Sequence, residues 1–407
     1  MHVLMLCSSY PRFAEDSASV FLRHLTLALS RGGADMRVLA PDHTMVGKSP
    51  ADPGIQLTHF RYFPRRWQTL AYGSGILPNL RKYPWRWIQV PFFILAMFAS
   101  LFTACLRNRP DVIHAHWILP QGLIAVWVGK LLAIPVVTTA HGSDVYSLRG
   151  GLLAALKRHT LRHSRAWTAN TKSTAFSAGA AGEIPTPHII PMGVDITQFG
   201  TQEKKGNPET DRASPGLVVL FVGRLEKVKG VSDLIRAFAL LPENLLVQTT
   251  LWIVGEGTER PELERLSREL GITTRIQFAG RVPHDALPGY HESATLFAAP
   301  SITDRHGDTE GQGVAIVEAM ASGLPVIACR TGGIRDVITH DQTGLLVEPR
   351  DPRALGDAIA TLLSDPEKRR KLGEAGQTHA RKYYSWDVVA GKFLDIFAGL
   401  YSGNTSD

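Results

Sequence analysis

The sequence predicts an α/β protein of two domains, each built on a doubly wound parallel sheet. Its 407 residues exceed the size at which one hydrophobic core usually stops growing, so two domains of about 200 residues are expected. Short apolar runs alternate with helical stretches in both halves, which is typical of parallel sheets with helices on both faces. Between the halves, residues 201–215 are polar and rich in residues that break helices and strands, which indicates a linker.

Each predicted strand is a short apolar run that ends in polar, glycine or histidine residues. In the first half these runs are Val3–Cys7, Arg37–Ala40, Val112–His114, Val136–Thr139 and Trp167–Ala169. In the second half they are Leu217–Val222, Leu251–Val254, Ile276–Phe278, Thr295–Ala299, Val326–Ala328 and Leu345–Val347. Ligands of such sheets bind outside the carboxyl ends of the strands, so candidate site residues are expected directly after these runs.

The composition is that of an ordered globular protein, with 44% hydrophobic and 20% charged residues. The cysteines Cys7, Cys105 and Cys329 are scattered and odd in number. They imply neither a disulfide framework nor a metal cluster, and they favour a reducing compartment. The apolar N-terminal run has no basic leader and is interpreted as a buried strand, not as a signal peptide. We therefore expect a cytoplasmic protein.

The formal net charge of +7 is concentrated in one interval. Between Asp52 and Asp111 there is no acidic residue, and the basic residues are Arg61, Arg65, Arg66, Arg81, Lys82, Arg86, Arg107 and Arg109. Aromatic residues lie among them, and the interval contains the apolar run Val90–Phe102. Basic and aromatic residues beside an apolar helix are typical of a membrane interface with anionic lipid, so this distribution argues against nucleic acid as the partner.

We therefore predict peripheral contact with an anionic membrane surface through residues 61–105. One alternative is a core helix with a solvated basic loop. A transmembrane helix is disfavoured because the apolar run is short and close to a proline.

Two glutamates eight residues apart, Glu310 and Glu318, are the most informative feature of the chain. Residues 314–322 predict a helix that Gly323 ends, with Pro325 just beyond it. The neighbours of Glu318 in this helix are apolar and favour burial. Its carboxylate therefore needs a partner.

The start of this helix is a predicted phosphate site. Gly311 and Gly313 have no side chains there, so backbone N–H groups can approach an anion, and the helix dipole favours negative charge at this end. A diphosphate bound there would leave one carboxylate for a sugar and the other for a ribose, which suits a nucleotide sugar. The alternative is that Glu310 is a solvated loop acid and Glu318 a residue of the helix surface.

The segment resembles the Glu-x7-Glu pattern of retaining glycosyltransferases of family 4 (GT4), and further segments match in order along nearly the whole chain. The resemblance implies the GT-B fold, in which two Rossmann-like domains face a central cleft. It implies that Glu310 contacts the donor sugar and Glu318 the ribose, and we expect Gly311, Gln312 and Gly313 to bind the donor between them. No metal and no cofactor are expected beside the nucleotide-diphosphate sugar.

The same resemblance gives the two domains their roles. Residues 1–200, together with the C-terminal helix 386–407, are expected to form an acceptor-side domain. Residues 216–385 are expected to form the domain that binds the donor.

Arg224 and Lys229 lie in Gly223–Gly230, directly after the first predicted strand of the second half. A guanidinium and an ammonium on such a loop can neutralise a leaving diphosphate, and solvated loop charges are the alternative. The segment resembles the family's Gly-Arg-x4-Lys-Gly element, in which the Arg and the Lys bind the donor phosphates. This favours Lys229 over Lys227.

Two further loops resemble donor-side loops of the family. Ile253–Gly257 has two glycines of a dinucleotide-binding turn but lacks the third, so it is weak evidence for a nicotinamide enzyme. Phe278–Val282 resembles the loop in which backbone groups near Arg281 and Val282 contact the nucleobase. Val282 is therefore a predicted donor-binding residue.

Histidines follow or end two strands of the first half. His141 lies in Thr139–Asp144 and resembles the histidine of the family's His-Gly-x-Asp element, which lies beside the donor sugar, although an isolated histidine at a strand end is more often structural. His114 and His116 share a face of their strand and resemble an element that lines the cleft or the acceptor side. One departure is the loop Ser8–Val20, which lacks the glycine pair of many family members.

The predicted function is that of a metal-independent, hexosyltransferase-like retaining glycosyltransferase. Arg224, Lys229 and the helix N-terminus would stabilise the departing diphosphate as its charge develops, and Glu310 and His141 complete the predicted catalytic residues. The basic, aromatic interval suggests a lipid-linked or glycan acceptor, used to build an exopolysaccharide or a similar envelope glycan. The alternatives are a sugar-nucleotide epimerase of the same fold and a non-enzymatic nucleotide-sugar sensor.

Overall fold

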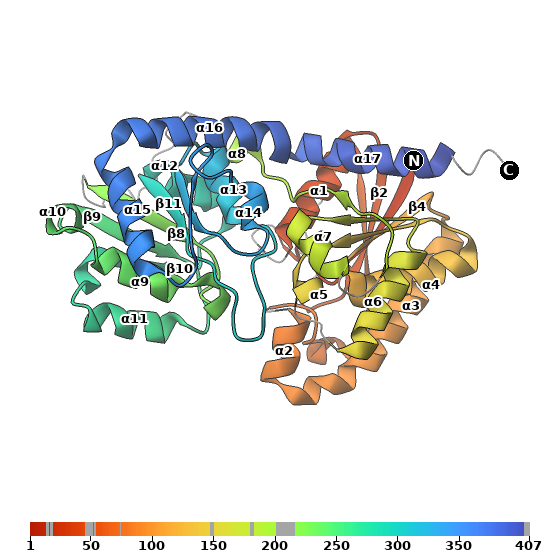
Figure 1. The fold of residues 1–407 in the computed structure, drawn as a ribbon. Coiled ribbons are helices and arrows are strands. Elements are labelled where there is room, and N and C mark those ends of the chain that lie inside the picture. Colours follow the sequence, from red (N-terminus) through yellow and green to blue (C-terminus); the bar gives the residue numbers. More distant parts are fainter. Residues whose placement is uncertain are drawn as a thin grey trace. The chain divides into compact units, whose positions relative to one another are not determined.

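The computed structural model describes residues 1–13, 16, 19–44, 52, 54–73, 75–146, 150–179, 183–200 and 216–402. The chain forms two compact units, Met1–Pro191 with Trp386–Asp407, and Met192–Ser385 (Figure 1). The predicted linker, 201–215, lies outside the described residues.

The boundary of the first unit lies at Pro191, whereas the predicted boundary lay at residue 200. Residues 192–200 belong to the second unit, where Val194 forms a parallel bridge with Ser385. The C-terminal helix α17 (Trp386–Ser402) groups with the first unit, although it follows the second unit in the chain.

The described part of the first unit contains a sheet of seven parallel strands in the order β3-β2-β1-β4-β5-β6-β7. These strands are β1 (His2–Leu6), β2 (Asp35–Pro41), β3 (Ile55–Phe60), β4 (Val112–His116), β5 (Val136–Ala140), β6 (Ala166–Ala169) and β7 (His188–Ile189). The helices are α1 (Val20–Arg31), α2 (Ile76–Lys82), α3 (Gln89–Arg107), α4 (Leu123–Leu132), α5 (Ser143–Tyr146), α6 (Gly151–His163) and α7 (Lys172–Gly179), with the short η1 (Arg65–Trp67), η2 (Pro84–Ile88) and η3 (Ile118–Gly122).

Alternate residues of β1 face opposite sides of this sheet, and each side has its own core. Leu4 and Leu6 pack with α3 and α4 on one side. Val3 and Met5 pack with α1 and α17 on the other. Because both faces are covered, the central strands are buried and mostly apolar, which is why they could be recognised as apolar runs.

The described part of the second unit contains six parallel strands in the order β10-β9-β8-β11-β12-β13. They are β8 (Leu217–Val222), β9 (Thr249–Val254), β10 (Ile276–Gly280), β11 (Leu296–Ala299), β12 (Val326–Cys329) and β13 (Leu345–Val347). The helices are α8 (Ile196–Phe199), α9 (Val231–Ala239), α10 (Glu243–Leu246), α11 (Arg260–Glu269), α12 (Leu287–Ser293), α13 (Val314–Ala321), α14 (Ile334–Val337), α15 (Pro352–Ser364) and α16 (Pro366–Tyr384), with the short η4 (Lys227–Lys229), η5 (Thr273–Arg275) and η6 (His284–Ala286).

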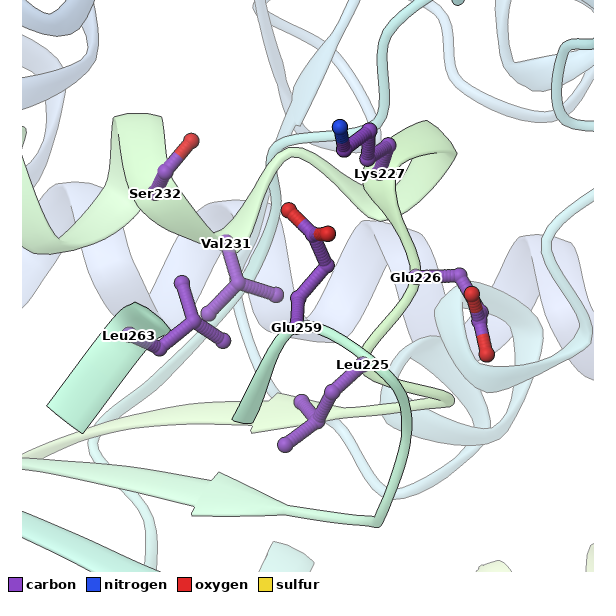
Figure 2. Close-up of a pocket in the computed structure, with 7 residues that line it drawn as sticks. All are labelled: Leu225, Glu226, Lys227, Val231, Ser232, Glu259 and Leu263. Atoms are coloured by element: carbon purple, nitrogen blue, oxygen red, sulfur yellow. The ribbon is translucent and has the colours of Figure 1, made fainter. Parts of the chain in front are cut away.

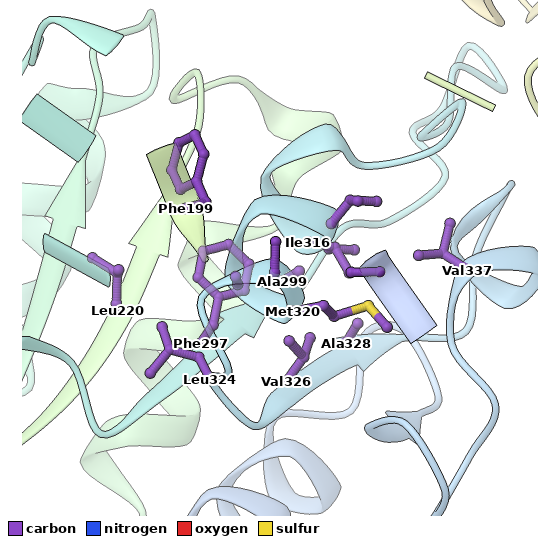
Figure 3. Close-up of a cluster of buried hydrophobic side chains, with 14 of the residues drawn as sticks. Phe199, Leu220, Phe297, Ala299, Ile316, Met320, Leu324, Val326, Ala328 and Val337 are labelled. Carbon is purple, nitrogen blue, oxygen red and sulfur yellow. The ribbon is translucent and has the colours of Figure 1, made fainter. Parts of the chain in front are cut away.

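Helix α13 is packed into one face of this second sheet. Ile316 and Met320 of the helix join Leu220 and Phe297 of the strands in a buried cluster (Figure 3). On the other face, α9, α11 and α15 cover the alternate residues of β8. The helix that carries Glu318 is thus held in the core and not on the surface.

The two predicted doubly wound parallel sheets are confirmed, and each of the predicted apolar runs forms a strand. Two strands were missed. β3 alternates between exposed and partly buried residues at the edge of its sheet, and β7 has only two residues, so neither forms an apolar run. The predicted helix end is also found, since α13 stops at Ala321 and Gly323 follows with a φ of +75°.

The apolar run Val90–Phe102 is part of a longer helix than its length suggested. η2 leads directly into α3, and Pro84–Arg107 is the one helix among the described residues that is long and apolar enough, by length and composition, to cross a membrane. Phe93, Met97 and Leu101 of α3 are nevertheless buried in the first unit's core. One face of the helix is therefore part of the globular fold.

We predict that Gly230→Ala destabilises the second unit much more than Gly271→Ala. Both glycines have positive φ, +64° and +70°, so each alanine costs about 1–2 kcal/mol in backbone strain. At Gly230 a Cβ atom would also lie 2.0 Å from the Pro300 carbonyl oxygen, whereas at Gly271 no described atom lies within 4 Å. Urea unfolding of the two variants measures the difference, and equal losses would contradict this close backbone approach.

Candidate functional site

Three loops at the carboxyl ends of β8, β9 and β10 are bonded to one another through their backbones. Leu225 donates its N–H to the Glu256 carbonyl at 3.0 Å, and Gly255 donates to the Gly280 carbonyl at 2.7 Å. A Cβ atom on Gly255 would lie 1.9 Å from the Gly223 carbonyl oxygen. The glycines after β9 are therefore required for the close approach of neighbouring loops.

Lys229 and Glu310 form an ion pair at this edge of the sheet. Lys229 Nζ donates to Glu310 Oε2, and both side chains are largely buried. Lys229 ends η4 after β8, and Glu310 precedes α13, so the fold brings together two residues that are far apart in the sequence.

Positive groups around Glu310 keep it ionised. Burial alone raises the pKa of a carboxyl group, but the charge and hydrogen bond of Lys229, the charge of Arg224 and the N–H of Gly313 outweigh it, and the pKa of Glu310 is lowered. An ionised carboxylate surrounded by donors can accept hydrogen bonds from sugar hydroxyl groups. As a nucleophile it is weakened by the same donors.

The start of α13 is built as the sequence predicted, with one difference. Gly313 has a φ of +81° and caps the helix, and its N–H faces the Glu310 carboxylate. Gln312, however, is buried, and its side chain forms two hydrogen bonds with the Met192 backbone. The Met192 N–H donates to Gln312 Oε1 at 2.7 Å, and Gln312 Nε2 donates to the Met192 carbonyl at 2.9 Å. The predicted donor-binding part of Gln312 is thus confined to its backbone, because its side chain anchors the chain that enters the second unit.

Glu318 has the partner that its burial demands, and this partner was missed in the sequence. His284 Nε2 lies 3.0 Å from Glu318 Oε1, and only 9% of the Glu318 side chain is exposed. Burial lowers the pKa of His284, but the hydrogen bond and the charge of Glu318 outweigh it with help from Asp285 and Asp195, so the pKa is raised. His284 begins η6, directly after the loop that contains Val282, and this closeness to Val282 is the only sequence feature that could have indicated it.

The two lysines near β8 differ in their surroundings. Lys227 is exposed and lines a small pocket with Glu226, Val231 and Glu259 (Figure 2). The empty space in this pocket, open solvent included, is about 190 Å³. Lys229 instead contacts Glu310, so of the two lysines it is Lys229 that lies beside a predicted site residue.

His141, in the first unit, follows β5 and is partly buried. Its ring Nε2 lies 2.9 Å from His116 Nδ1, and its backbone N–H donates to Asp144 Oδ1 at 3.0 Å. His114 and His116 do share a face of β4, but both are fully buried. The expectation that these two side chains line a cleft or an acceptor side is wrong, because both are enclosed. Phe393 of α17 and Thr139 contact His114, and the rings of His114 and His141 contact His116.

These histidines are not gathered as a metal site. Within the described residues, no group of three His, Cys, Asp or Glu side chains could hold a metal ion.

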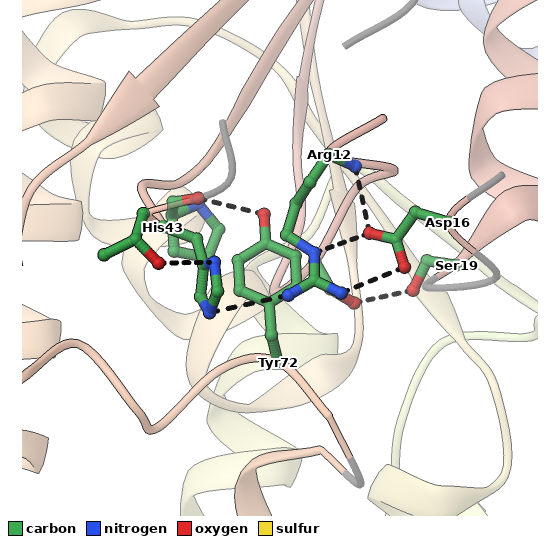
Figure 4. Close-up of polar contacts among 8 residues, drawn as sticks. Arg12, Asp16, Ser19, His43 and Tyr72 are labelled. Carbon is green, nitrogen blue, oxygen red and sulfur yellow. Dashed lines mark hydrogen bonds and ion pairs between the residues drawn. The ribbon is translucent and has the colours of Figure 1, made fainter. Parts of the chain in front are cut away.

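The loop after β1 is held by a charged pair in place of glycines. Arg12 Nε donates to Asp16 Oδ2 at 2.6 Å, and the guanidinium lies over the ring of Tyr72, 4.7 Å from its centroid (Figure 4). The Tyr72 hydroxyl donates to the Pro41 carbonyl at 2.9 Å, which links this loop to the end of β2. Polar groups therefore gather at the carboxyl edge of the first sheet as well.

We predict that the His284–Glu318 pair stabilises the second unit at acidic pH and loses this contribution at alkaline pH. Because the pKa of His284 is raised on folding, the contribution is complete below about pH 6.5, the ordinary pKa of histidine, and is lost as the pH rises through the folded pKa. His284→Gln should lower the free energy of unfolding more at about pH 6 than at about pH 8.5.

Urea unfolding at the two pH values measures this dependence. His306→Gln is a matched control, since His306 is exposed and lies outside the pair. A loss in His284→Gln that does not change with pH would contradict the ionic pairing.

Two family models match the chain. The model of Glycosyltransferase Family 4 matches residues 18–198, and the model of Glycosyl transferases group 1 matches residues 203–379. A GDP-mannose-dependent alpha-(1-6)-phosphatidylinositol monomannoside mannosyltransferase of Mycolicibacterium smegmatis is 31% identical over 69% of this chain and 74% of its own. A D-inositol 3-phosphate glycosyltransferase of Xylanimonas cellulosilytica is 27% identical over 93% of this chain and 91% of its own.

Solved structures share the fold. Sucrose-phosphate synthase from Thermosynechococcus elongatus matches with a TM-score of 0.77 at 22% identity, covering 99% of this chain and 100% of that chain. HepE from Anabaena in complex with UDP matches with a TM-score of 0.74 at 20% identity, and the match covers 98% of this chain and 100% of that chain. The chain therefore belongs to the family 4 glycosyltransferases and has the GT-B fold of two Rossmann-like domains.

Proposed function

We propose that this glycosyltransferase moves a hexose from a nucleotide-diphosphate sugar to a hydroxyl group of a lipid-linked or glycan acceptor, with retention at the anomeric carbon. The observation that carries the donor part is the Lys229–Glu310 pair at the start of α13. It places a cation, a carboxylate and a helix N-terminus together. The cation and the helix N-terminus suit a diphosphate, and the carboxylate suits a sugar hydroxyl.

Glu318 and Val282 complete the proposed donor site. Glu318 lies in α13 and is held by His284, so one of its oxygen atoms has a fixed direction and the other can accept from the ribose hydroxyls. Val282 precedes η6, which carries His284, so the base-binding backbone and the ribose-binding carboxylate are connected. The name of the mannosyltransferase relative specifies GDP-mannose, and HepE is solved with UDP-glucose, which supports a nucleotide sugar as the donor class.

In the proposed reaction, the bond between the anomeric carbon and the β-phosphate oxygen breaks. The diphosphate leaves with the electron pair, and Lys229, Arg224 and the N–H groups before α13 stabilise its growing charge. The acceptor oxygen bonds to the anomeric carbon on the same face, and its proton passes to the leaving phosphate. Glu310 acts by binding and electrostatics, since its surroundings weaken it as a nucleophile. No metal or other cofactor is part of the proposal.

We predict that Lys229→Ala and Arg224→Ala weaken binding of the cognate nucleotide-diphosphate sugar about tenfold or more, because a charge-assisted hydrogen bond contributes about 1.5–3 kcal/mol. Calorimetric titration with uridine, guanosine and adenosine diphosphate sugars would identify the donor and measure the loss. Lys227→Ala is the matched control, as this exposed lysine lies two positions from Lys229 and should bind the donor normally.

An equal loss in all three variants would contradict the assigned phosphate site.

The reaction products decide between the proposed function and its alternatives. Transfer to an acceptor with retention supports the proposal, epimerised donor without acceptor would favour an epimerase, and binding without any turnover would favour a sensor.

We further propose that the first unit docks on an anionic membrane through the outer face of η2 and α3, at the inner side of the cytoplasmic membrane. From Trp87 to Leu106 this helix carries no charged residue. Its outward side chains include Phe92, Leu95 and Leu106, and Leu95 is 66% exposed. Water is a poor environment for such a face, and lipid is a good one.

Charge and aromatic residues support lipid as the occupant of this face. Trp67, Trp85 and Trp87 are at least half exposed, and tryptophan favours the level of the lipid headgroups. Arg61 and Arg65 pair with Asp42, but the interval 61–109 has no acidic residue of its own, so its net positive charge complements anionic lipid. Because the opposite face of α3 is buried in the core, the helix would lie in the interface and not span it. A membrane-borne acceptor, as in the name of the mannosyltransferase relative, would then be within reach.

We predict that the protein sediments with anionic phosphatidylglycerol vesicles and that Leu95→Asp weakens this binding at least about tenfold. An aspartate in lipid costs about 2.5–3.5 kcal/mol at depth, and about 1.4 kcal/mol corresponds to tenfold. Leu240→Asp is the control, since Leu240 is a comparably exposed leucine, 60% accessible, in the second unit. Equal binding of both variants, or dimerisation through α3 without lipid binding, would contradict the membrane proposal.

A further inference from the structure

Three histidine rings form a connected group at the carboxyl edge of the first sheet. His114 and His116 come from β4, and their ring centroids lie 4.2 Å apart. His141 follows β5, the strand that pairs with β4 in parallel. His116 Nδ1 lies 2.9 Å from His141 Nε2, so these two nitrogens share one proton. Burial lowers the pKa of His114 and of His141 to about 3 and that of His116 also falls, hence all three rings are neutral near pH 7.

The other nitrogen of His116 decides which ring donates. His116 Nε2 is buried and has no hydrogen-bond partner among the described residues. If His141 donated to His116, then His116 would carry its proton on Nε2, as a buried N–H without an acceptor. Buried N–H groups without a partner are rarer than under-satisfied acceptors. The favoured arrangement has the proton of His116 on Nδ1, with this N–H donating to His141 Nε2.

The ring of His141 is otherwise held in place by its surroundings. Asp144 accepts the backbone N–H groups of His141 and Ile118, at 3.0 and 2.7 Å. The rings of Phe21 and Trp117 flank the imidazole, with centroids 5.3 and 4.9 Å away. These contacts fix where the ring lies but do not select its tautomer. That selection is left to His116.

We propose that His116 is a positioning residue, which holds His141 in the tautomer protonated on Nδ1 and thereby makes this N–H a neutral hydrogen-bond donor for an oxygen of the sugar substrate. The substrate contact rests on the proposed function, whereas the tautomer does not. A neutral donor in a buried setting stabilises charge on a substrate oxygen without giving up its proton. His116 itself touches no substrate, since its side chain is fully buried.

The test is the tautomer of His141, observed by long-range proton–nitrogen NMR of protein labelled with ¹⁵N in its histidine rings. The signals of His141 are those that disappear in His141→Gln. The wild type is expected to show a protonated Nδ1 and a bare Nε2 for this ring. A proton on Nε2 in the wild type would overturn the proposal, even if no His116 variant could be purified.

Two variants of His116 separate the hydrogen bond from packing. His116→Phe keeps a buried ring but removes both nitrogens, so His141 should lose its preference for the Nδ1 proton. His116→Asn places an amide N–H near the former Nδ1 and should restore that preference. His114→Phe alters the same cluster but leaves the bond between His116 and His141, so the tautomer should not change. A His116→Phe spectrum identical to that of the wild type would overturn the proposal.

Kinetics complete the test. His116→Phe should lower kcat about tenfold with little change in the KM of the donor, a smaller loss than the roughly 10²–10³ for removing such a donor outright. His116→Asn should recover most of it, and no recovery together with a restored tautomer would overturn the catalytic part. If the wild type transferred no sugar from any donor, the proposed function would fail while the NMR result would still decide the role of His116.

Discussion

The pairing of a buried carboxylate with a lysine, Glu310 with Lys229, is the interaction around which the second unit is arranged. Removing two charges from water is costly, and leaving one of them without its partner costs several kcal/mol more. Both residues must therefore be delivered to the same place by the backbone. Gly230 lets the turn after Lys229 pass close to Pro300, and the Gly333 N–H donates to the Glu310 carbonyl at 2.9 Å.

A pair of this kind is poorly explained as a device for stability. A hydrophobic pair of similar volume would often be as stable or more stable. It is well explained as a site that is ready for ligand charge, because a diphosphate can replace the carboxylate as the partner of Lys229 and free the carboxylate for a sugar hydroxyl. Glu318 and His284 show the same principle further along α13. Each acidic group is held by a basic partner before any donor arrives.

Much of this arrangement could be predicted from the sequence, because it depends on local patterns. The central strands of both sheets are covered on two sides, so they form mostly apolar runs, and Gly313 and Gly323 at the two ends of α13 have positive φ, which few other residues adopt. Glu310 and Lys229 could be found because their loops follow a strand or begin a helix, and Glu318 because it is the one carboxylate in a short apolar helix. His284 and the bond between Gln312 and Met192 could not, because both are contacts between segments far apart in the chain. His114 and His116 were placed on the same face of β4, as found, but the covering of His114 by α17 was not visible in their own segment.

The most direct test of the central claim is a crystal structure of the protein with an intact nucleotide-diphosphate sugar. The diphosphate is predicted to lie within hydrogen-bond distance of Lys229 Nζ and of the backbone N–H groups before α13, with the ribose on Glu318 and the bond between Lys229 and Glu310 lengthened or broken. A nucleotide bound elsewhere, with the Lys229–Glu310 pair intact, would contradict the assignment of this pair as the donor site.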